Sequence, residues 1–218
     1  IYIVPKVHLR NAVQEAPASS LKLFVRSSCQ RDHTVKKDIL MGRSRFKFFE
    51  QHYPYFVTST INEGIPLFSD PLIAEILLAS LEHLQKEQRV KLYGYVIMEN
   101  HLHMVIESKE ASIVLKSFKS FTAKMIIESL KERGRALYLK KLRFHKKAHK
   151  TQSEYQVWQE GCHPKQINSP SKMIACLEYI HNNPVKAGFV EDIRHWRYSS
   201  AKNYMNEAGI ISVSLFEG

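Results

Sequence analysis

Two apolar segments that follow each other closely constrain the fold more than any other feature of this chain. Residues 91–98 (KLYGYVIM) and 102–107 (LHMVIE) contain several β-branched and aromatic side chains, and only three residues separate them. Such runs favour β-strands. A connection as short as the one at Glu99-Asn100 is typical of an antiparallel hairpin, so we expect the chain to contain an antiparallel sheet.

The segments around this hairpin alternate between strand and helix patterns. Residues 53–61 favour a strand, and Asp70-Pro71 begins a helix, because Asp is a good N-cap and Pro suits the first helical position. Later segments predict a helix over 112–133, a short strand over 155–158, and a helix from Ser171 that ends near Asn183, before Pro184. The order strand, helix, strand, strand, helix, strand predicts an α+β fold of the ferredoxin-like split βαβ type, with helices packed on one face of the antiparallel sheet.

The charge of the chain is strongly positive and is concentrated in two blocks. The 218 residues carry 32 Lys or Arg against 21 Asp or Glu, a formal net charge of +11. Residues 1–45 hold nine basic and three acidic residues, and residues 131–150 hold nine basic residues and one acid. Clusters of Lys and Arg gain affinity for a polyanion by displacing its condensed counterions, which points to a nucleic acid or an anionic surface as partner.

These two blocks also suggest how the chain is divided. Like charges repel, so both blocks are interpreted as solvated interaction segments. Residues 1–45 are expected to form a basic N-terminal arm that is partly disordered, with a short strand over 21–25. Residues 131–150 are expected to be the end of a helix followed by a flexible basic loop. One globular domain remains over 46–207, and residues 208–218 form a C-terminal tail.

The sequence indicates neither a membrane protein nor a disulfide-rich secreted protein. No run reaches the roughly 18 apolar residues that a membrane helix needs, and the start IYIVPKVHLR lacks the apolar stretch of a secretory signal. Cys29, Cys162 and Cys176 show no CxxC spacing. We therefore expect a cytoplasmic protein with reduced thiols.

A histidine pair opens the second strand of the hairpin. His101 and His103 flank Leu102, and side chains two residues apart in a strand point to the same face. Both imidazoles can therefore bind one metal ion. The alternative is that they are two ordinary histidines on a polar face of the sheet.

A tyrosine and an asparagine on the last predicted helix form a second candidate element. Asn183 follows Tyr179 by four residues, which places both on one helix face if the last turn persists to Pro184. A phenol near a divalent cation can act as a nucleophile, and an amide oxygen is a hard ligand suited to Mg²⁺ or Mn²⁺. The alternative is that Tyr179 is a half-buried packing residue.

Four motifs in the same order resemble one known family, the HUH single-tyrosine transposases. Within that family they are most similar to the branch associated with repetitive extragenic palindromes in bacteria. YGYVIMENHLHMVIE at 93–107 resembles its histidine motif, and YIHNNPVKAGFV at 179–190 its catalytic-tyrosine motif. VWQEGCHP at 157–164 and HWRYSSAKNY at 195–204 resemble flanking segments. The sequence departs from the family at Glu99, where relatives usually have Pro, and we interpret Glu99 as facing solvent.

The resemblance implies a metal-dependent single-stranded DNA endonuclease and strand transferase that works without a nucleotide cofactor. By position, His101 and His103 would bind Mg²⁺ or Mn²⁺ with Asn183 as a third ligand, and Tyr179 would be the nucleophile that forms a 5′-phosphotyrosine. It also implies a homodimer that acts on single-stranded or hairpin-bearing DNA, with no membrane partner.

The basic block supplies the candidate DNA contacts. Its Lys and Arg side chains would orient the phosphate backbone without reading its sequence; the candidates are Arg133, Arg135, Lys140, Lys141, Arg143, Lys146, Lys147 and Lys150. Two alternatives stay open at this point. One is a non-catalytic RNA or single-stranded DNA binding module built on a ferredoxin-like sheet, and the other is a domesticated relative that cleaves DNA without moving itself.

Overall fold

The structure, a computed structural model, describes residues 53–162 and 164–217. The predicted N-terminal arm over 1–45, with its short strand over 21–25, lies outside the described residues. No helix in the described ranges is long and apolar enough to cross a membrane.

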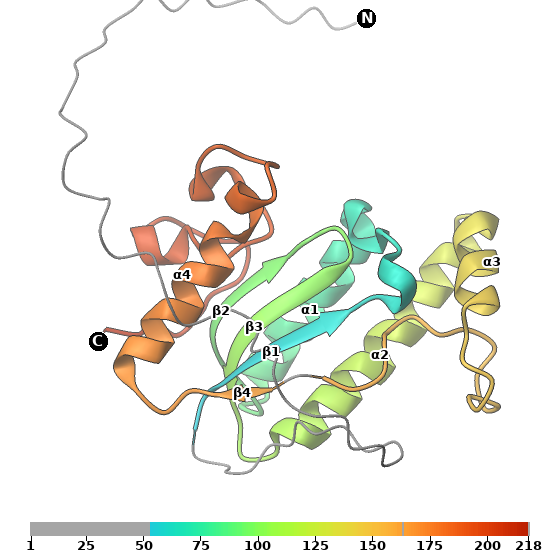
Figure 1. The fold of residues 1–218 in the computed structure, drawn as a ribbon, viewed down its shortest axis with the longest axis horizontal. Coiled ribbons are helices and arrows are strands. Elements are labelled where there is room, and N and C mark those ends of the chain that lie inside the picture. The colour runs from blue at the N-terminus through green and yellow to red at the C-terminus, as the bar shows by residue number, and fades with distance from the viewer. Residues whose placement is uncertain (1–52, 163, 218) are drawn as a thin grey trace, which may run out of the picture. The chain divides into compact units, whose positions relative to one another are not determined.

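A four-stranded antiparallel sheet forms the centre of the described chain. Its strands are β1 (Tyr55–Thr60), β2 (Lys91–Ile97), β3 (His101–Glu107) and β4 (Lys165–Gln166), in the spatial order β2-β3-β1-β4 (Figure 1). β2 and β3 form the predicted hairpin, and β1 pairs antiparallel with both β3 and β4. This strand order is that of the split βαβ fold, and the predicted α+β, ferredoxin-like fold is confirmed.

Two long helices cover one face of the sheet. Asp70 caps α1 (Pro71–Lys86) by accepting a hydrogen bond from the Leu72 amide, as its position before Pro71 predicts. α2 spans Ala111–Glu132. Apolar side chains of both helices pack with alternate residues of the strands, such as Tyr55 and Val57, in the larger hydrophobic core.

A further helix covers the opposite face of the sheet. α4 (Pro170–Lys186) begins at Ser169, whose hydroxyl accepts from the Lys172 amide. Met173, Leu177 and Ile180 of α4 pack with Phe56, Val96 and Val105 of the strands in a second hydrophobic core. The sheet is therefore covered on both faces, with α1 and α2 on one and α4 on the other (Figure 1). The prediction of helices on one face holds for α1 and α2 but not for α4, because the outward-facing residues Phe56, Val96 and Val105 are also apolar and need cover.

α4 also corrects the predicted end of this helix, because it continues through Pro184 to Lys186. A proline removes one backbone donor, here the one that would reach Ile180. The last turn nevertheless closes, because the Ala187 amide donates to the Asn183 carbonyl at 3.0 Å and the Gly188 amide to the Val185 carbonyl at 3.0 Å. Pro184 itself is buried. One missing bond so close to a helix end is tolerated.

Two further sequence predictions are wrong. Residues 131–150 do not form only a loop, because α3 spans Ala136–Phe144. Leu142 is fully buried and Leu139 packs against the core, so apolar burial outweighs the repulsion among its basic residues. Residues 155–158 form no strand; Trp158 makes only an isolated bridge to Ile61, and the short edge strand is β4.

The chain after α4 covers the outer edge of β2. The Ile97 amide donates to the Tyr198 carbonyl and the Ser200 amide to the Tyr95 carbonyl, at 2.9 and 3.0 Å. Further on, the Ser214 amide donates to Leu92, so residues beyond 207 also pack on the sheet. The remaining elements are short 3-10 helices at Asn62–Gly64, Leu67–Ser69, Ile193–His195 and Asn203–Met205.

Candidate active site

The two histidines lie side by side on the sheet face that α4 covers. In the β1–β3 ladder His101 pairs with Thr60 and His103 with Thr58, so both imidazoles point to one face, as their spacing predicts. Their ring centroids are 4.7 Å apart. The pair is thus close enough for both rings to bind one ion.

His103 is held as a neutral imidazole. Only 6% of the residue is exposed, and this burial lowers its pKa to about 3, with smaller contributions from the neighbouring charges of His101 and Lys165. Its Nδ1 lies 2.8 Å from the Thr58 hydroxyl. That hydroxyl can accept from Nδ1–H, the tautomer that leaves the Nε2 lone pair free for a metal.

Asn100 orients His101 in the same way. The Asn100 side chain donates from Nδ2 to the Gly64 carbonyl at 3.1 Å, which turns Oδ1 toward His101 Nδ1 at 2.7 Å. An amide oxygen only accepts, so His101 donates from Nδ1 and keeps its lone pair on Nε2. Burial lowers the pKa of His101 as well. Both rings are therefore in the form that binds metal.

Tyr179 of α4 meets the histidines within the same chain. Its ring centroid lies 5.4 Å from that of His103 and 5.7 Å from that of Phe56, both in edge-on contacts. Tyr179 is half-buried and packs against the second core, as the alternative interpretation expected, but it does so beside the two histidines. Among the described residues, none forms a hydrogen bond with its hydroxyl. These contacts fix the position of the ring.

Asn183 lies one turn after Tyr179 on the same helix. Because α4 runs through Pro184, the condition for placing both side chains on one helix face is met. The residue is half-buried. Within the described ranges no three His, Cys, Asp or Glu side chains converge on a common point. The prediction of Asn183 as a third ligand therefore rests on its place one turn after Tyr179 on α4.

The donor set suits a divalent ion. Two neutral imidazoles and an amide oxygen are neutral ligands that leave coordination positions for water or phosphate oxygens, the oxygen ligands that Mg²⁺ and Mn²⁺ prefer. Glu99, the departure from the family motif, is exposed on the hairpin turn, in agreement with its interpretation as a solvent-facing residue.

Two lysines that the sequence analysis did not identify flank the site. Lys165 of β4 pairs with Phe56 across the ladder, and its charge reaches His103. Lys186 places its Nζ 5.7 Å from the Tyr179 ring centroid. A two-residue strand leaves no pattern to detect, and Lys186 lies beyond the predicted helix end. Both ammonium groups add positive charge where a phosphate would have to approach.

A buried contact fixes α4 on β2. His181 Nε2 lies 2.9 Å from the Ser200 hydroxyl, and that hydroxyl accepts from the Tyr95 amide at 2.9 Å. Burial lowers the pKa of His181 to about 4, so it is neutral at physiological pH. Ser200 belongs to the segment HWRYSSAKNY, whose structural task is therefore to connect the tyrosine helix to the sheet edge.

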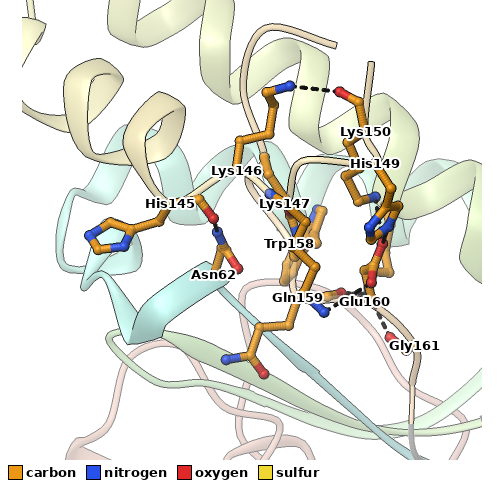
Figure 2. Close-up of polar contacts among 12 residues, drawn as sticks. Asn62, His145, Lys146, Lys147, His149, Lys150, Trp158, Gln159, Glu160 and Gly161 are labelled. Carbon is orange, nitrogen blue, oxygen red and sulfur yellow. Dashed lines mark hydrogen bonds and ion pairs between the residues drawn. The ribbon is translucent and has the colours of Figure 1, made fainter. Parts of the chain in front are cut away.

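The candidate DNA contacts of the basic block fall into two groups. Arg133 is used internally, because it donates to Asp70 at 2.5 Å and to the Ser129 carbonyl. Arg143 pairs with Glu154. Lys147 and Lys150 surround Glu160 together with His149, and Lys146 donates to the Lys150 carbonyl (Figure 2). Arg135, Lys140 and Lys141 are exposed, and no described acid pairs with them.

In this chain a ferredoxin-like sheet presents a histidine pair to a tyrosine on a helix, and comparison with known proteins shows the family to which the chain belongs. Residues 49–183, which include all four candidate site residues, match the model of the IS200-like transposase family. The chain therefore belongs to the IS200-like transposases, a family of DNA-cleaving enzymes. No curated protein matches the sequence.

One solved structure supports the fold. A REP-associated tyrosine transposase bound to a REP hairpin is similar at a TM-score of 0.55 and 14% sequence identity, over 81% of this chain and 96% of that one. A protein of Deinococcus radiodurans R1 assigned as a transposase shows 14% identity and a TM-score of 0.39, over 65% of this chain and 97% of that one. At this identity the first similarity bears on the fold alone.

Proposed function

We propose that this protein is a metal-dependent nuclease and strand transferase that cuts single-stranded DNA beside a hairpin through a covalent 5′-phosphotyrosine. The observation that carries the proposal is the contact of Tyr179 with His103 at 5.4 Å between ring centroids, next to a pair of imidazoles that are neutral and suitably oriented. The family match and the hairpin bound to the structurally similar REP-associated transposase support it.

The proposed chemistry assigns one task to each side chain. His101, His103 and Asn183 would hold Mg²⁺ or Mn²⁺, which when bound polarises the scissile phosphate and stabilises its developing charge. The Tyr179 oxygen attacks phosphorus, the bond from phosphorus to the 3′ oxygen breaks, and the phenol proton is balanced by the proton that the 3′ oxygen takes up. Lys165 and Lys186 would attract the phosphate to this position.

The covalent intermediate explains why no nucleotide cofactor is needed. The phosphotyrosine ester conserves the phosphodiester bond until another 3′-OH attacks it, and that attack releases Tyr179. Rejoining therefore needs no external energy source. Arg135, Lys140 and Lys141 remain our first candidates for orienting the DNA backbone, and we expect the active species to be a homodimer.

A covalent-capture experiment tests the nucleophile. A hairpin oligonucleotide labelled at its 3′ end is incubated with the protein and Mn²⁺, and denaturing gels measure the labelled protein. We expect a labelled adduct with the wild type and none with Tyr179→Phe, because the variant lacks only the attacking oxygen and keeps the ring. DNA binding by the variant should remain.

Tyr138→Phe is the matched control, because Tyr138 is another half-buried tyrosine on a helix. It should form the adduct as the wild type does. An undiminished adduct in Tyr179→Phe would show that the nucleophile is a different residue. A wild type that binds hairpin DNA but never forms an adduct would instead support a non-catalytic binding module.

A further inference from the structure

A large groove of the described chain lies away from the candidate active site. It has a volume of about 1130 Å³ and is formed by α2 on one side and residues 153–162 on the other. α2 covers the sheet face opposite to the one that carries the histidines and Tyr179. The groove is therefore not a part of the site described above.

A row of lysines follows this groove along α2. The side chains of Lys116, Lys124 and Lys131 line it, together with Lys119 from the same helix and Lys150 from the opposite wall. The first and last of the row are 15 residues apart, which corresponds to about 22 Å along a helix. One DNA strand carries a phosphate about every 3.4 Å of duplex axis, so the row matches the length of about six successive phosphates.

Contacts between Lys119 and the facing segment 159–161 fix the shape of the groove. Lys119 Nζ donates to the Gln159 and Gly161 carbonyls, each at 2.8 Å, so that α2 is tied to the facing wall. Burial lowers the pKa of Lys119 to about 8. Glu160 fixes the next part of that wall by pairing with Lys147, His149 and Lys150 (Figure 2). The groove is thus built before any ligand binds.

The aromatic residues of the groove are not available to unpaired bases. Of the described lining residues, Tyr155 and Trp158 are the aromatic ones. Trp158 is 5% exposed and belongs to the core. The Tyr155 ring is contacted by Lys131 Nζ and by Arg143 Cζ, each 5.3 Å from its centroid. Binding of single strands relies on stacking of bases on free rings, and this groove offers positive charge and serine hydroxyls instead.

The groove leads toward the candidate active site. Its wall ends at Cys162, and Lys165 of β4, whose charge reaches His103, follows three residues later. Three residues span at most about 11 Å. DNA held in the groove could therefore continue past the β4 edge of the sheet to the histidine pair.

We propose that this groove binds the phosphate backbone of the double-stranded stem of the substrate hairpin, chiefly through Lys116, Lys124 and Lys131. The proposal rests on the DNA-cleaving function proposed above and adds a second binding surface to it. The stem would be held on the α2 side while the adjoining single strand reaches Tyr179 on the α4 side.

Binding measurements with a matched pair of variants test the proposal. Lys116→Gln/Lys124→Gln removes two charges of the groove, and Lys109→Gln/Lys86→Gln removes two exposed charges outside it. Each pair contains one lysine in a surface ion pair on its own helix, Lys124 with Glu128 and Lys86 with Glu82. All four lysines are exposed, so both double variants should fold.

The full-length chain carrying Tyr179→Phe is titrated with two labelled DNAs over a range of salt concentrations. One is a hairpin with a single-stranded flank, and the other is a strand of equal length that cannot pair. Each lost phosphate contact lowers the slope of log Kd against log salt by about 1. The groove variant should lose about 2 from this slope and bind the hairpin about tenfold more weakly, with little change for the unpaired strand.

The outcomes separate this proposal from the proposed function. Adduct formation is measured separately in chains that keep Tyr179. Hairpin affinity equal to that of the control pair, together with a normal adduct in the Tyr179-containing protein, would overturn the groove proposal alone. An equal loss on both DNAs would overturn the assignment to the stem, because it would show binding of any strand. If the otherwise wild-type protein formed no adduct on any hairpin, the proposed function itself would fail.

Discussion

The approach of α4 to β2 at Gly94 gives a prediction whose size follows from the structure. The β2–β3 ladder shifts register between Leu92 and Gly94, and there Leu177 of α4 packs directly on the strand. A methyl group on Gly94 would lie 2.6 Å from Leu177 Cδ2 and 3.3 Å from the Ser200 hydroxyl. Carbon atoms pack at about 3.5–4.0 Å, so Gly94→Ala requires a shift of about 1 Å.

We expect this overpacking to lower the free energy of unfolding by about 1–3 kcal/mol. For a domain of this size, each kcal/mol corresponds to about 2–4 °C in Tm. Leu177 is only 6% exposed, so its side chain has little room to turn away and we expect α4 to move. Tyr179 lies two residues after Leu177, so a displaced α4 also moves the phenol. A misplacement of about 1 Å between reacting groups can slow a reaction by about 100-fold, and adduct formation should fall more than stability explains.

A double-mutant cycle identifies the cause. Leu177→Ala alone should cost about 2–5 kcal/mol through the cavity it leaves. In combination with Gly94→Ala it removes the clash, so the double variant should be more stable than the sum of the two effects predicts by at least about 1 kcal/mol. Urea denaturation gives the free energy of unfolding of the wild type, the two single variants and the double variant. Additive effects, or a Gly94→Ala variant as stable as the wild type, would refute this account of the contact.

Two more predictions concern metal binding and pH. Asn100→Ala removes the acceptor that orients His101, so Mn²⁺ affinity measured by calorimetry should fall about 10–100-fold. Glu99→Gln, a change on the exposed turn, should leave the affinity unchanged. If Asn100→Ala bound Mn²⁺ as tightly as the wild type, Asn100 would have no orienting role. His181 has a folded-state pKa of about 4 against about 6.5 when unfolded, so the unfolded chain binds more protons and stability falls as pH drops from about 6.5 toward 4. His181→Gln should remove up to about 3 kcal/mol of this acid-induced loss in denaturation at pH 7 and pH 4; an unaltered pH profile would exclude His181 as its source.

Much of the fold was predictable because its signals are local. Asp70-Pro71 begins α1 in the sequence and in the structure, and the hairpin lies at the residues that its two apolar runs indicate. The failures have physical causes. The charges of residues 131–150 masked the apolar residues that bury α3, and the rule for residues before proline did not account for helix bonds that form beyond it.

The candidate site was predictable in part. Strand periodicity places His101 and His103 on one face, and the register confirms it. No spacing rule brings Tyr179 to them across 76 residues; only the order of the family motifs suggested this meeting. Thr58, Asn100 and Lys165 act through pairing across strands or through a turn, and such partners become visible only when the chain is folded.

The attachment of α4 to β2 has a consequence for the DNA. Leu177 packs on Gly94 and His181 meets Ser200, on either side of Tyr179 in the sequence, so this helix is anchored before and after its reactive residue. A strand end joined to such a helix would stay where it was cut. The second DNA end would then have to reach it by bending and refolding of the nucleic acid, and not by movement of α4.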